Sequence, residues 1–377
     1  MHEPAAALRE RQANHGGGTF VGSMAELPPQ IDHDKGAADV LLVDFGGGNH
    51  GHRGQYNAML AQLFRLRTAP FGPAMLLSRR VVLVPQIEVA PGLFFMTCLI
   101  RTALGLRTVG LLLRPLPALH GTSLRLRIKR AALILLRQLR RVSVLTIIPF
   151  AVDPALSRIA RGWIHDLQNW DFALGSATDP AQSALTASQV RGAAAGRTVC
   201  VAIGGQNRAK GFDRFAALWS DNAEMRRAFL FAFGGTVSAD LSAAAARFAE
   251  TGGYALNRFV SDAELYGLYQ AADLVWCAYD PSYDQASGIL GRAMQFGIPV
   301  VVRKGSVIER LCHLVDHPHM TEAALAQGAA VPLPIAPHQA AARARAQGRT
   351  SLARLAEALG TLPAIDPFVA ADPGQIP

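Results

Sequence analysis

The stretch NRFVSDAELYGLYQAADLVWCAYDPSYDQASGILGRAMQFGIPVVV, residues 257–302, decides the fold class. Its apolar runs Leu274–Cys277 and Val300–Val302 predict buried strands, and each run follows a segment of helical composition. A Ser-Asp pair precedes the first helical segment, and Gly297 and Pro299 end the second. Strands that alternate with helices in this way predict a parallel sheet covered on both faces.

The same alternation extends outward over most of the chain. Further strands are expected over Val40–Phe45, Val81–Val84, Val109–Leu113, Val144–Ile148, Val199–Ile203 and Phe229–Phe233. Helices are expected over Tyr56–Leu66, Asp213–Leu218, Ser238–Glu250 and Asp262–Ala271. The predicted fold class is therefore α/β, with two Rossmann-like parallel-sheet domains that face a cleft.

Composition divides the chain into five segments. Residues 1–37 mix Gly, Pro, His and charged residues, so we expect a disordered N-terminal tail. One Rossmann-like domain is expected over 38–178 and a second over 198–360. The segment 179–197 is small and polar without strong apolar periodicity, so it is predicted to be a linker, and 361–377 a C-terminal tail.

Cysteine usage and hydropathy favour a cytoplasmic protein. The four cysteines include no CxxC pair, which favours reduced, packed residues over a disulfide framework or a zinc site. The longest apolar run, 89–100, has about a dozen residues and is followed by Arg101. A membrane-spanning helix needs about 20 apolar residues, so we expect none in this chain.

Charge is distributed unevenly along the sequence. Between Asp44 and Asp153 the single acid is Glu88, so this stretch carries +14, whereas the whole chain carries +9. The basic first half points to an anionic partner, which is a nucleic acid, a phosphorylated substrate or an anionic lipid. Nucleic acid is disfavoured, because aromatic residues are sparse in the basic region and no familiar nucleic-acid motif is present.

A glycine loop, FGGGNHGHRGQY, follows the first expected strand. Gly47 and Gly48 permit close backbone approach, and His50 and His52 are either loop surface residues or face the cleft. Gly46, Gly48 and Gly51 fit the GxGxxG spacing of dinucleotide sites, but no acid follows at the distance that holds a ribose. A nicotinamide site is therefore disfavoured, and a purely structural turn remains an alternative.

Two further segments are suited to binding a diphosphate. In AIGGQNRAKGFDRF, residues 202–215, Arg208 and Lys210 project from a glycine-flanked turn directly after a strand. Ser287 and Gly288 begin a helix whose free N–H groups and dipole favour an anion. Asp284 precedes them, within reach of sugar or ribose hydroxyl groups. The alternatives are a solvated Arg–Lys pair and a well-capped structural helix.

Together these motifs resemble the donor-binding half of family-four glycosyltransferases, which have the GT-B fold and retain anomeric configuration. The resemblance is strong over about 198–305 and weaker over 39–175. It implies a donor-nucleotide domain in the second half and an acceptor-side domain in the first. It also implies a nucleotide diphosphate sugar as donor and no essential metal or other cofactor. The chain contains no DxD-type metal motif, which fits this expectation.

The resemblance also implies roles for individual residues. Lys210 matches the lysine that contacts the donor diphosphate, and Gly204 matches the motif glycine. Gly205 stands where an arginine is usual, so Arg208 is expected to substitute for it. Ser287 and Gly288 match the small residues that meet the phosphates.

Two further positions concern the donor and the reacting sugar. Asp284 matches the first acid of a two-glutamate motif, and Arg292 replaces the second, which would bond the donor ribose. Arginine cannot accept hydrogen bonds, so Arg292 pairs with Asp284, reaches a phosphate, or marks altered nucleotide recognition or lost transfer. His120, in RPLPALHGTSL, is the candidate for the catalytic region, together with Asp284; the alternative for His120 is a surface loop histidine.

A basic helix is expected over residues 123–142. Ile128, Ala131, Ala132, Leu135, Leu139 and Val142 share one face, and Arg125, Lys129, Arg130, Arg137, Arg140 and Arg141 gather on the other. Leu126, Leu133 and Leu136 lie among these cations. Such a helix is suited to an anionic membrane surface, with 89–100 as a second contact. The alternative is a solvated face over the domain core.

The sequence thus favours a cytoplasmic glycosyltransferase at the inner face of the cell membrane. It would transfer a sugar from a nucleotide diphosphate sugar to a lipid-linked or polysaccharide acceptor, in exopolysaccharide or cell-surface glycan synthesis. Arg292 and Gly205 support a second reading, a glycosyltransferase-like subunit that binds without turnover. Another GT-B enzyme, such as a sugar-nucleotide epimerase, is a third.

Overall fold

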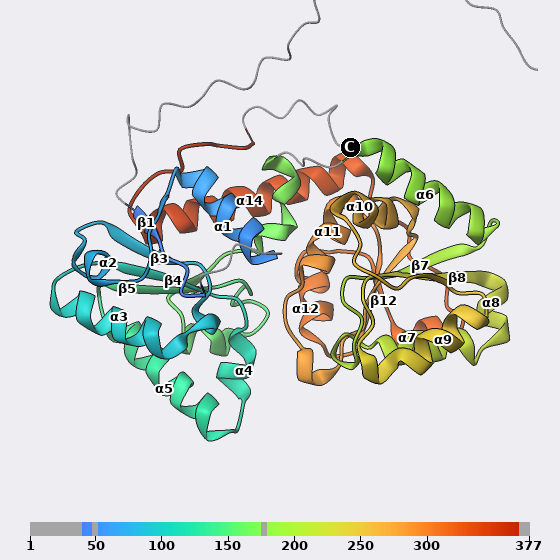
Figure 1. Cartoon of the computed structure of the whole chain (residues 1–377), viewed down its shortest axis with the longest axis horizontal. Helices are drawn as coiled ribbons and strands as arrows, with labels where there is room; N and C mark the ends of the chain where they lie inside the picture. Colours follow the sequence, from blue (N-terminus) through green and yellow to red (C-terminus); the bar gives the residue numbers. More distant parts are fainter. Residues whose placement is uncertain (1–39, 47–51, 175–178, 369–377) are drawn as a thin grey trace, which may run out of the picture. The chain divides into compact units, whose positions relative to one another are not determined.

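The computed structural model describes residues 40–46, 52–174 and 179–368 of the 377-residue chain (Figure 1). The first half contains β1 (Val40–Leu42), α1 (His52–Phe64), β2 (Arg67–Thr68), α2 (Pro73–Leu77), β3 (Val81–Val84), η1 (Ile87–Val89), α3 (Pro91–Ala103), β4 (Thr108–Leu112), α4 (Pro115–His120), α5 (Leu124–Gln138), β5 (Val142–Thr146), η2 (Pro154–Arg158), β6 (Gly162–Trp163), η3 (Leu167–Asn169) and η4 (Asp171–Leu174), where η marks 3₁₀ turns.

The second half begins with α6 (Pro180–Ala194). It continues with β7 (Thr198–Ile203), η5 (Arg208–Lys210), α7 (Phe212–Ser220), α8 (Ala223–Ala228), β8 (Phe229–Gly234), η6 (Ala239–Leu241), α9 (Ser242–Glu250), β9 (Tyr254–Leu256), α10 (Asp262–Ala271), β10 (Leu274–Cys277), η7 (Pro281–Tyr283), α11 (Gly288–Phe296), β11 (Val300–Val302), α12 (Val307–Leu314), β12 (His319–Thr321), α13 (Glu322–Ala326) and α14 (Pro337–Leu359).

The strands form two six-stranded sheets whose pairings are all parallel within the described residues. The first sheet has the order β2-β1-β3-β4-β5-β6, and the second has the order β12-β11-β10-β7-β8-β9. The strand order therefore reverses between β1 and β3 in the first sheet and between β7 and β10 in the second. The predicted α/β fold with two Rossmann-like sheets is confirmed.

Helices cover both faces of the first sheet, as the continuous apolar strands require. Val40 and Leu42 of β1 belong to the same buried cluster as the apolar side chains of α1. Leu41 and Val43 belong to the cluster that contains the buried side chains of α3 and α5. Successive strand residues point to opposite faces, so one three-residue strand contributes to two cores.

Aromatic stacking holds α7 and α9 against the second sheet. Phe215 of α7 stacks on Phe231 of β8 with ring centroids 4.8 Å apart, and it meets Trp276 of β10 edge-on at 5.4 Å. Phe248 of α9 lies 5.7 Å from Phe215. Such ring pairs contribute roughly 0.5–1.5 kcal/mol each beyond the burial of their area.

The segment 179–197, predicted to be a linker, forms helix α6 instead. Asp179 caps the helix by accepting hydrogen bonds from the N–H groups of Ala181 (2.9 Å) and Gln182 (3.2 Å). The buried face of α6 is small, and the Ser183 hydroxyl on that face donates to the carbonyl oxygen of Ala263 in α10 (2.9 Å). Small residues allow this close approach between two helices, which is why no period of large apolar residues marks α6.

Helix α5 ends at Gln138, four residues before the predicted end, and it buries a different face from the one expected at a membrane. Leu133 and Leu136, predicted to lie among the cations at a lipid surface, are buried in the core of the first sheet. Ile128 and Leu135 are exposed. The prediction that Leu133 and Leu136 lie at a lipid surface is therefore wrong, because both side chains pack in the core of the first sheet.

The last helix contributes to both halves of the molecule. Near its beginning, Arg343 donates to the carbonyl oxygen of Asp316, which follows α12, at 2.6 Å. Near its end, Leu352, Leu355 and Leu359 join the buried cluster on the α1 face of the first sheet. Helix α14 lies within the range expected for the second domain, 198–360, yet its C-terminal half completes a core of the first sheet.

Residues 361–368, predicted to begin a C-terminal tail, pack on the first half. The N–H group of Ala364 donates to the carbonyl oxygen of Leu63 in α1 (2.8 Å). Phe368 is buried, with its ring centroid 5.7 Å from that of Trp170. Within the described residues, no helix combines the length and the apolar character that crossing a bilayer requires.

Close packing of α10 on α6 depends on Gly267. A Cβ atom at this position would overlap the Ser183 carbonyl oxygen and lie 2.6 Å from the Thr186 Cβ. We expect Gly267→Ala to lower the free energy of unfolding by about 1–3 kcal/mol, although alanine favours a helix by about 1 kcal/mol over glycine. Urea unfolding followed by circular dichroism measures this change.

Gly192 on α6 is the matched control. A Cβ atom there meets no atom within 4 Å, so Gly192→Ala should raise the unfolding free energy by up to about 1 kcal/mol. If both alanine variants are equally stabilised, close approach of α6 and α10 is not what requires a glycine at 267.

Candidate functional site

The second sheet provides a binding position where its strand order reverses. β7 and β10 are neighbours, but the chain leaves them toward opposite edges of the sheet. Ligands in such sheets bind beyond the carboxyl ends of the strands at this reversal. The segments that begin there are the turn after β7, with Lys210, and the loop after β10, which leads into α11.

Lys210 places a half-buried ammonium group at this position. Asn207 fixes the turn, because its side-chain oxygen accepts a hydrogen bond from the Lys210 backbone N–H at 2.9 Å. Burial lowers the pKa of Lys210, although the nearby Cys277 opposes this shift. Over residues 40–46, 52–174 and 179–368, no carboxylate forms an ion pair with its ammonium group. A buried cation in this situation gains from an anionic ligand.

Gly204 brings Lys210 and α11 together. Its φ of 83° lies in the left-handed region, which a side chain rarely adopts. A Cβ atom at Gly204 would lie 3.1 Å from the Lys210 Nζ and 3.7 Å from the Ile289 Cδ1 in the first turn of α11. The lysine head group therefore lies beside the beginning of that helix.

The first turn of α11 offers backbone donors. Ser287 is the N-cap residue, and its hydroxyl accepts a hydrogen bond from the Ile289 N–H at 3.2 Å and lies 2.9 Å from the Tyr279 hydroxyl. In the described part of the chain, no acceptor is present for the N–H groups of Gly288 and Leu290. A helix beginning with free N–H groups beside an ammonium is suited to bind phosphate.

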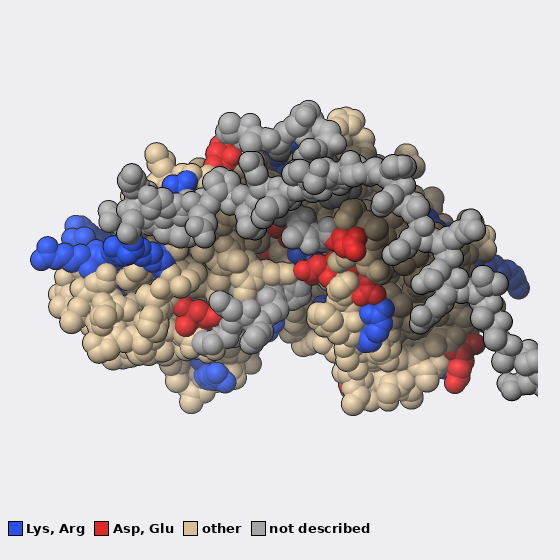
Figure 2. All heavy atoms as spheres, turned by 45° about the horizontal axis from the view of Figure 1, so that its top comes forward, with Lys and Arg blue, Asp and Glu red and all other residues tan. Residues whose placement is uncertain are grey.

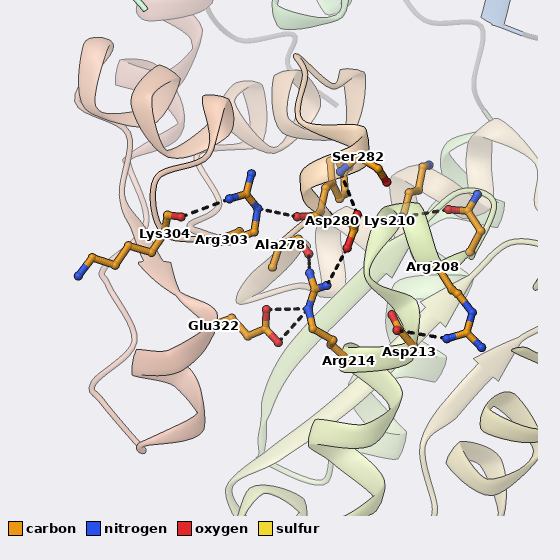
Figure 3. A network of polar contacts seen from close by, with 12 residues as sticks. Arg208, Lys210, Asp213, Arg214, Ala278, Asp280, Ser282, Arg303, Lys304 and Glu322 are labelled. Carbon is orange, nitrogen blue, oxygen red and sulfur yellow. Dashed lines mark hydrogen bonds and ion pairs between the residues drawn. The ribbon is translucent and has the colours of Figure 1, made fainter. Parts of the chain in front are cut away.

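Arg214 of α7 holds the loop after β10 in place (Figure 3). Its Nε donates to the Glu322 carboxylate at 3.0 and 3.2 Å, and its guanidinium also donates to the Ala278 carbonyl oxygen. The backbone N–H of Asp280 donates to the carbonyl oxygen of Ala209 at 3.0 Å, which ties this loop to the Lys210 turn. These contacts fix the two segments of the site relative to each other.

Asp284 has partners within its own half of the chain. Its carboxylate pairs with Arg303 at 3.1 Å and accepts a hydrogen bond from the Val307 N–H at the beginning of α12 at 2.9 Å. Arg303 also donates to the carbonyl oxygen of Tyr279 at 3.0 Å. Both oxygens of Asp284 therefore tie the loop between β10 and α11 to the segment that begins α12, and the catalytic role of Asp284 stays a prediction.

Arg208 points away from Lys210 (Figure 3). Its guanidinium lies 2.9 Å from the Asp240 carboxylate and 3.7 Å from that of Asp213. The side chain is exposed, so these ion pairs contribute little to stability. They do neutralise the charge, and the structure thus favours Lys210 over Arg208 as the cation of the site. Gly205, in the same turn, is exposed.

Arg292 forms a buried ion pair with Asp171 of η4. The Nε and Nη2 atoms lie 3.2 and 3.0 Å from the Asp171 Oδ2, and about a tenth of each side chain is exposed. Burial raises the pKa of Asp171, and the charge of Arg292 opposes this shift. The alternative in which Arg292 pairs with Asp284 is therefore wrong, because Asp284 pairs with Arg303.

The sequence did not identify the partners of Arg292. Gln295 donates to the Asp171 Oδ1 at 2.6 Å and to the Gln168 carbonyl oxygen at 2.8 Å. Gln168 also lies against Gly288, where a Cβ atom would overlap its side-chain amide. Asp171 and Gln168 lie more than a hundred positions before α11, in a segment without regular periodicity, so no local pattern could connect them.

The structure describes only some of the candidate site residues of the first half. Gly47, Gly48 and His50 lie outside the described residues, and so does the side chain of His52, which begins α1. His120 ends α4, and its exposed ring places Nε2 2.8 Å from the Asp153 Oδ2. The carboxylate orients the ring and leaves Nδ1 available. The catalytic role of His120 stays a prediction.

One group of side chains in the described ranges has a geometry that could hold a metal ion. Donor atoms of Glu309, His313 and His319 lie within 4.8 Å of one another. These residues belong to α12 and β12 and not to the Lys210 turn or the first turn of α11. The expectation that the chemistry needs no metal stays a prediction.

Comparisons with known proteins identify the architecture. No family model and no curated protein matches the chain. Among solved structures, Anabaena HepE in complex with UDP is 15% identical, with 85% of this chain and 99% of that chain covered and a TM-score of 0.59. For HepE with UDP and glucose the values are 15%, 86%, 100% and 0.55. The chain has a GT-B fold.

A more distant GT-B structure also matches. An α,α-trehalose-phosphate synthase (UDP-forming) from Burkholderia xenovorans, in complex with glucose-6-phosphate, is 14% identical over 74% of each chain, with a TM-score of 0.46. These identities concern the fold. The finer resemblance to family four and the retention of anomeric configuration stay predictions.

The ion pair between Arg292 and Asp171 should be structural. We expect Arg292→Met to lower the unfolding free energy by about 3–5 kcal/mol, since it leaves Asp171 buried without its partner. The double variant Arg292→Met, Asp171→Leu removes both charges, and most of the loss should disappear. Urea unfolding of the wild type, the single variants Arg292→Met and Asp171→Leu, and the double variant gives the interaction energy. Additive losses would contradict a pairwise role.

Asp166, beside this pair, should make stability depend on pH. Burial raises its pKa to about 6 from an ordinary 3.8; the charge of Asp171 adds to the shift, while the Gln168 N–H and Arg292 oppose it. Between these pH values the folded chain binds more protons than the unfolded chain. Stability that is present below pH 3.8 is therefore lost as the pH rises to about 6.

The size of this effect is on the order of 3 kcal/mol. Asp166→Asn does not titrate, so the unfolding free energy of the wild type relative to this variant should fall between pH 4 and pH 7. Chemical unfolding at several pH values measures the difference. A constant difference would show that Asp166 keeps an ordinary pKa in the folded chain.

Proposed function

We propose that the chain is a glycosyltransferase that transfers a sugar from a UDP-sugar to a lipid-linked or polysaccharide acceptor. The observation that carries this proposal is the half-buried ammonium of Lys210, which has no ion-pair partner in the described residues and lies beside Gly204 and the first turn of α11. HepE, which has the same fold, was solved in complex with UDP, and this supports UDP as the nucleotide of the sugar donor.

The residues of the site would stabilise the leaving diphosphate. As the bond between the sugar and the diphosphate breaks, negative charge accumulates on the diphosphate oxygens. The Lys210 ammonium and the N–H groups of Gly288 and Leu290 are preorganised donors for this charge. Transfer would proceed with retention, as the resemblance to family four implies, and without a metal or other cofactor.

In the first half, the His120 ring would act near the reacting sugar. In its neutral form, with Nε2–H donated to Asp153, Nδ1 is the acceptor nitrogen. It would accept a hydrogen bond or a proton from a hydroxyl group.

The basic first half would lie at the inner face of the cell membrane, with Arg125, Lys129, Arg130, Arg137, Arg140 and Arg141 in or just after α5. Figure 2 shows basic side chains gathered at the left, where Figure 1 draws the first sheet.

A binding subunit without turnover is the second candidate. The positions that resemble a two-glutamate motif hold Asp284, engaged with Arg303 and Val307, and Arg292, engaged with Asp171. Arg292 has no carboxylate, and both oxygens of the Asp284 carboxylate already have partners, so neither residue offers a free carboxylate to the donor ribose. Binding of UDP without transfer would favour this candidate.

Calorimetric titration of the purified chain with UDP tests the site. We expect UDP to bind, and Lys210→Met to weaken binding at least tenfold, because the ammonium meets the diphosphate. Arg208→Met is the matched control, since Asp240 and Asp213 already neutralise Arg208; its affinity should change less than threefold. Equal losses in both variants would place the diphosphate nearer Arg208 than the structure indicates.

Turnover separates the two candidate functions. A transferase should release UDP from a UDP-sugar faster when a lipid extract that contains the acceptor is added, and Lys210→Met should abolish this release. If UDP binds and no UDP-sugar is consumed under any of these conditions, the binding subunit is favoured. If UDP does not bind at millimolar concentration, the donor site itself is wrong.

A further inference from the structure

A cavity of about 830 Å³ lies between α3 and α5, on one face of the first sheet. Figure 1 shows the two helices side by side on this face. Phe94 and Phe95 of α3 line one wall, and Leu126, Ile128 and Leu135 of α5 line the other. The size is within the range of small-molecule sites, which is about 300–1,000 Å³.

The rim of this cavity is apolar and open to solvent. Ile128 is 61% exposed and Leu135 48%, although both are large aliphatic residues. On α3, Met96 and Ile100 are also exposed. An exposed apolar surface next to an apolar cavity is typical of an interaction site rather than of a solvated helix face.

One end of the cavity is polar and lies at the strand ends. Glu88 belongs to η1, directly after β3, where the strand order of the first sheet reverses. Its Oε1 accepts a hydrogen bond from the Arg114 N–H at 2.5 Å, whereas its Oε2 is buried and has no hydrogen-bond partner. A buried acceptor without a partner is costly, and a hydroxyl group of a ligand would satisfy it.

Two cations of α5 line the same cavity. Lys129 is half-buried and Arg125 is exposed, and Glu88 is the single acid of the lining. Burial lowers the pKa of Lys129, the charge of Glu88 opposes this, and Arg125 adds to it. The rest of α5 carries further cations and no acid. The polar end of the cavity therefore has a net positive charge, which favours an anionic head group.

We propose that this cavity holds the hydrocarbon chain of a phosphate-bearing lipid, with the phosphate beside Arg125 and Lys129. A hydroxyl group of the head group would donate to the Glu88 Oε2. The position at the strand ends favours a bound substrate over a lipid of the bulk membrane. That this lipid carries the acceptor sugar rests on the proposed function.

Binding of farnesyl phosphate to the full chain, below its micellar concentration, tests the proposal. This probe has an isoprenoid chain and a phosphate and can be followed by calorimetry. Farnesol keeps the chain without the charge, and inorganic phosphate keeps the charge without the chain. We expect farnesyl phosphate to bind at least tenfold more tightly than farnesol, and inorganic phosphate to show no measurable binding.

Variants that fill the cavity should remove this binding. Ala132 and Gly92 both line the cavity, and a Cβ atom at Gly92 meets no atom within 4 Å. Ala132→Phe and Gly92→Phe should each weaken farnesyl phosphate binding at least tenfold, whereas Gly92→Ala should leave it within twofold. Two independent variants and a matched alanine guard against loss of binding through misfolding.

The charge contribution has its own matched pair. Lys129→Met should weaken farnesyl phosphate at least fivefold and leave farnesol unchanged. Arg137→Met removes an exposed cation of the same helix that does not line the cavity, and it should change neither affinity. Equal binding by the wild type and by both cavity-filling variants overturns the proposal, and so does equal loss in Lys129→Met and Arg137→Met.

Titration with UDP keeps the two proposals separate. If farnesyl phosphate does not bind and UDP does, the cavity proposal fails and the proposed function stands. If farnesyl phosphate binds in the expected manner and UDP does not, the lipid site stands without its role in glycosyl transfer. Anionic vesicles should still bind Ala132→Phe, since the surface cations of α5 remain in this variant. If binding of farnesyl phosphate and of vesicles is lost only when surface cations are removed, the proposal is overturned and these cations bind the bulk membrane.

Discussion

The reversal of strand order between β7 and β10 is the constraint on which the candidate site depends. Because the chain leaves these neighbouring strands in opposite directions, the connections that follow them diverge and leave their N–H groups and side chains uncovered. The turn with Lys210 and the first turn of α11 lie there. Arg214 and Arg303 then hold the surrounding loops by hydrogen bonds to backbone carbonyl oxygens. Backbone topology creates this position, and the hydrogen bonds of the half-buried Arg214 and Arg303 hold the loops around it.

The buried ion pair between Arg292 and Asp171 is the second determinant of the site. It connects α11 to the η3–η4 segment that ends the first half of the described chain. A glutamate at position 292 would place a second carboxylate against Asp171. The arginine that stands at this position, in place of the expected glutamate, therefore matches its acidic partner. The position of α11 thus depends on an ion pair with a segment more than a hundred residues earlier in the chain.

Much of the fold could be predicted from the sequence, because buried parallel strands leave a local signal. Val81–Val84, Leu274–Cys277 and Val300–Val302 are found with the predicted bounds, and the Ser261 cap of α10 forms a complete capping box. These features depend on neighbours in sequence. The places of Lys210 in the turn after β7 and of Ser287 at the beginning of α11 are predicted for the same reason, since each follows from a strand–turn–helix pattern.

The failures have a common physical cause. Helix α6 was missed because its packing uses small residues, and the buried face of α5 was misjudged because periodicity does not say which face a sheet will cover. The alternative in which Arg292 pairs with Asp284 is wrong because the partner of Arg292, Asp171, is distant in sequence. In each case the deciding contact is tertiary, and a single sequence carries no record of it.

Helix α14 has a consequence for the order in which the molecule can form. Its C-terminal half supplies Leu352, Leu355 and Leu359 to the core around β1 and α1, and Ala364 adds a hydrogen bond to Leu63. During synthesis the first sheet is made before α14, so the core on its α1 face lacks these leucines until the second sheet has been made. The second sheet, made later, has its α7 and α9 face complete first. The half that is translated first thus completes its core only after α14 has been made, and until then part of its apolar surface is exposed to other chains.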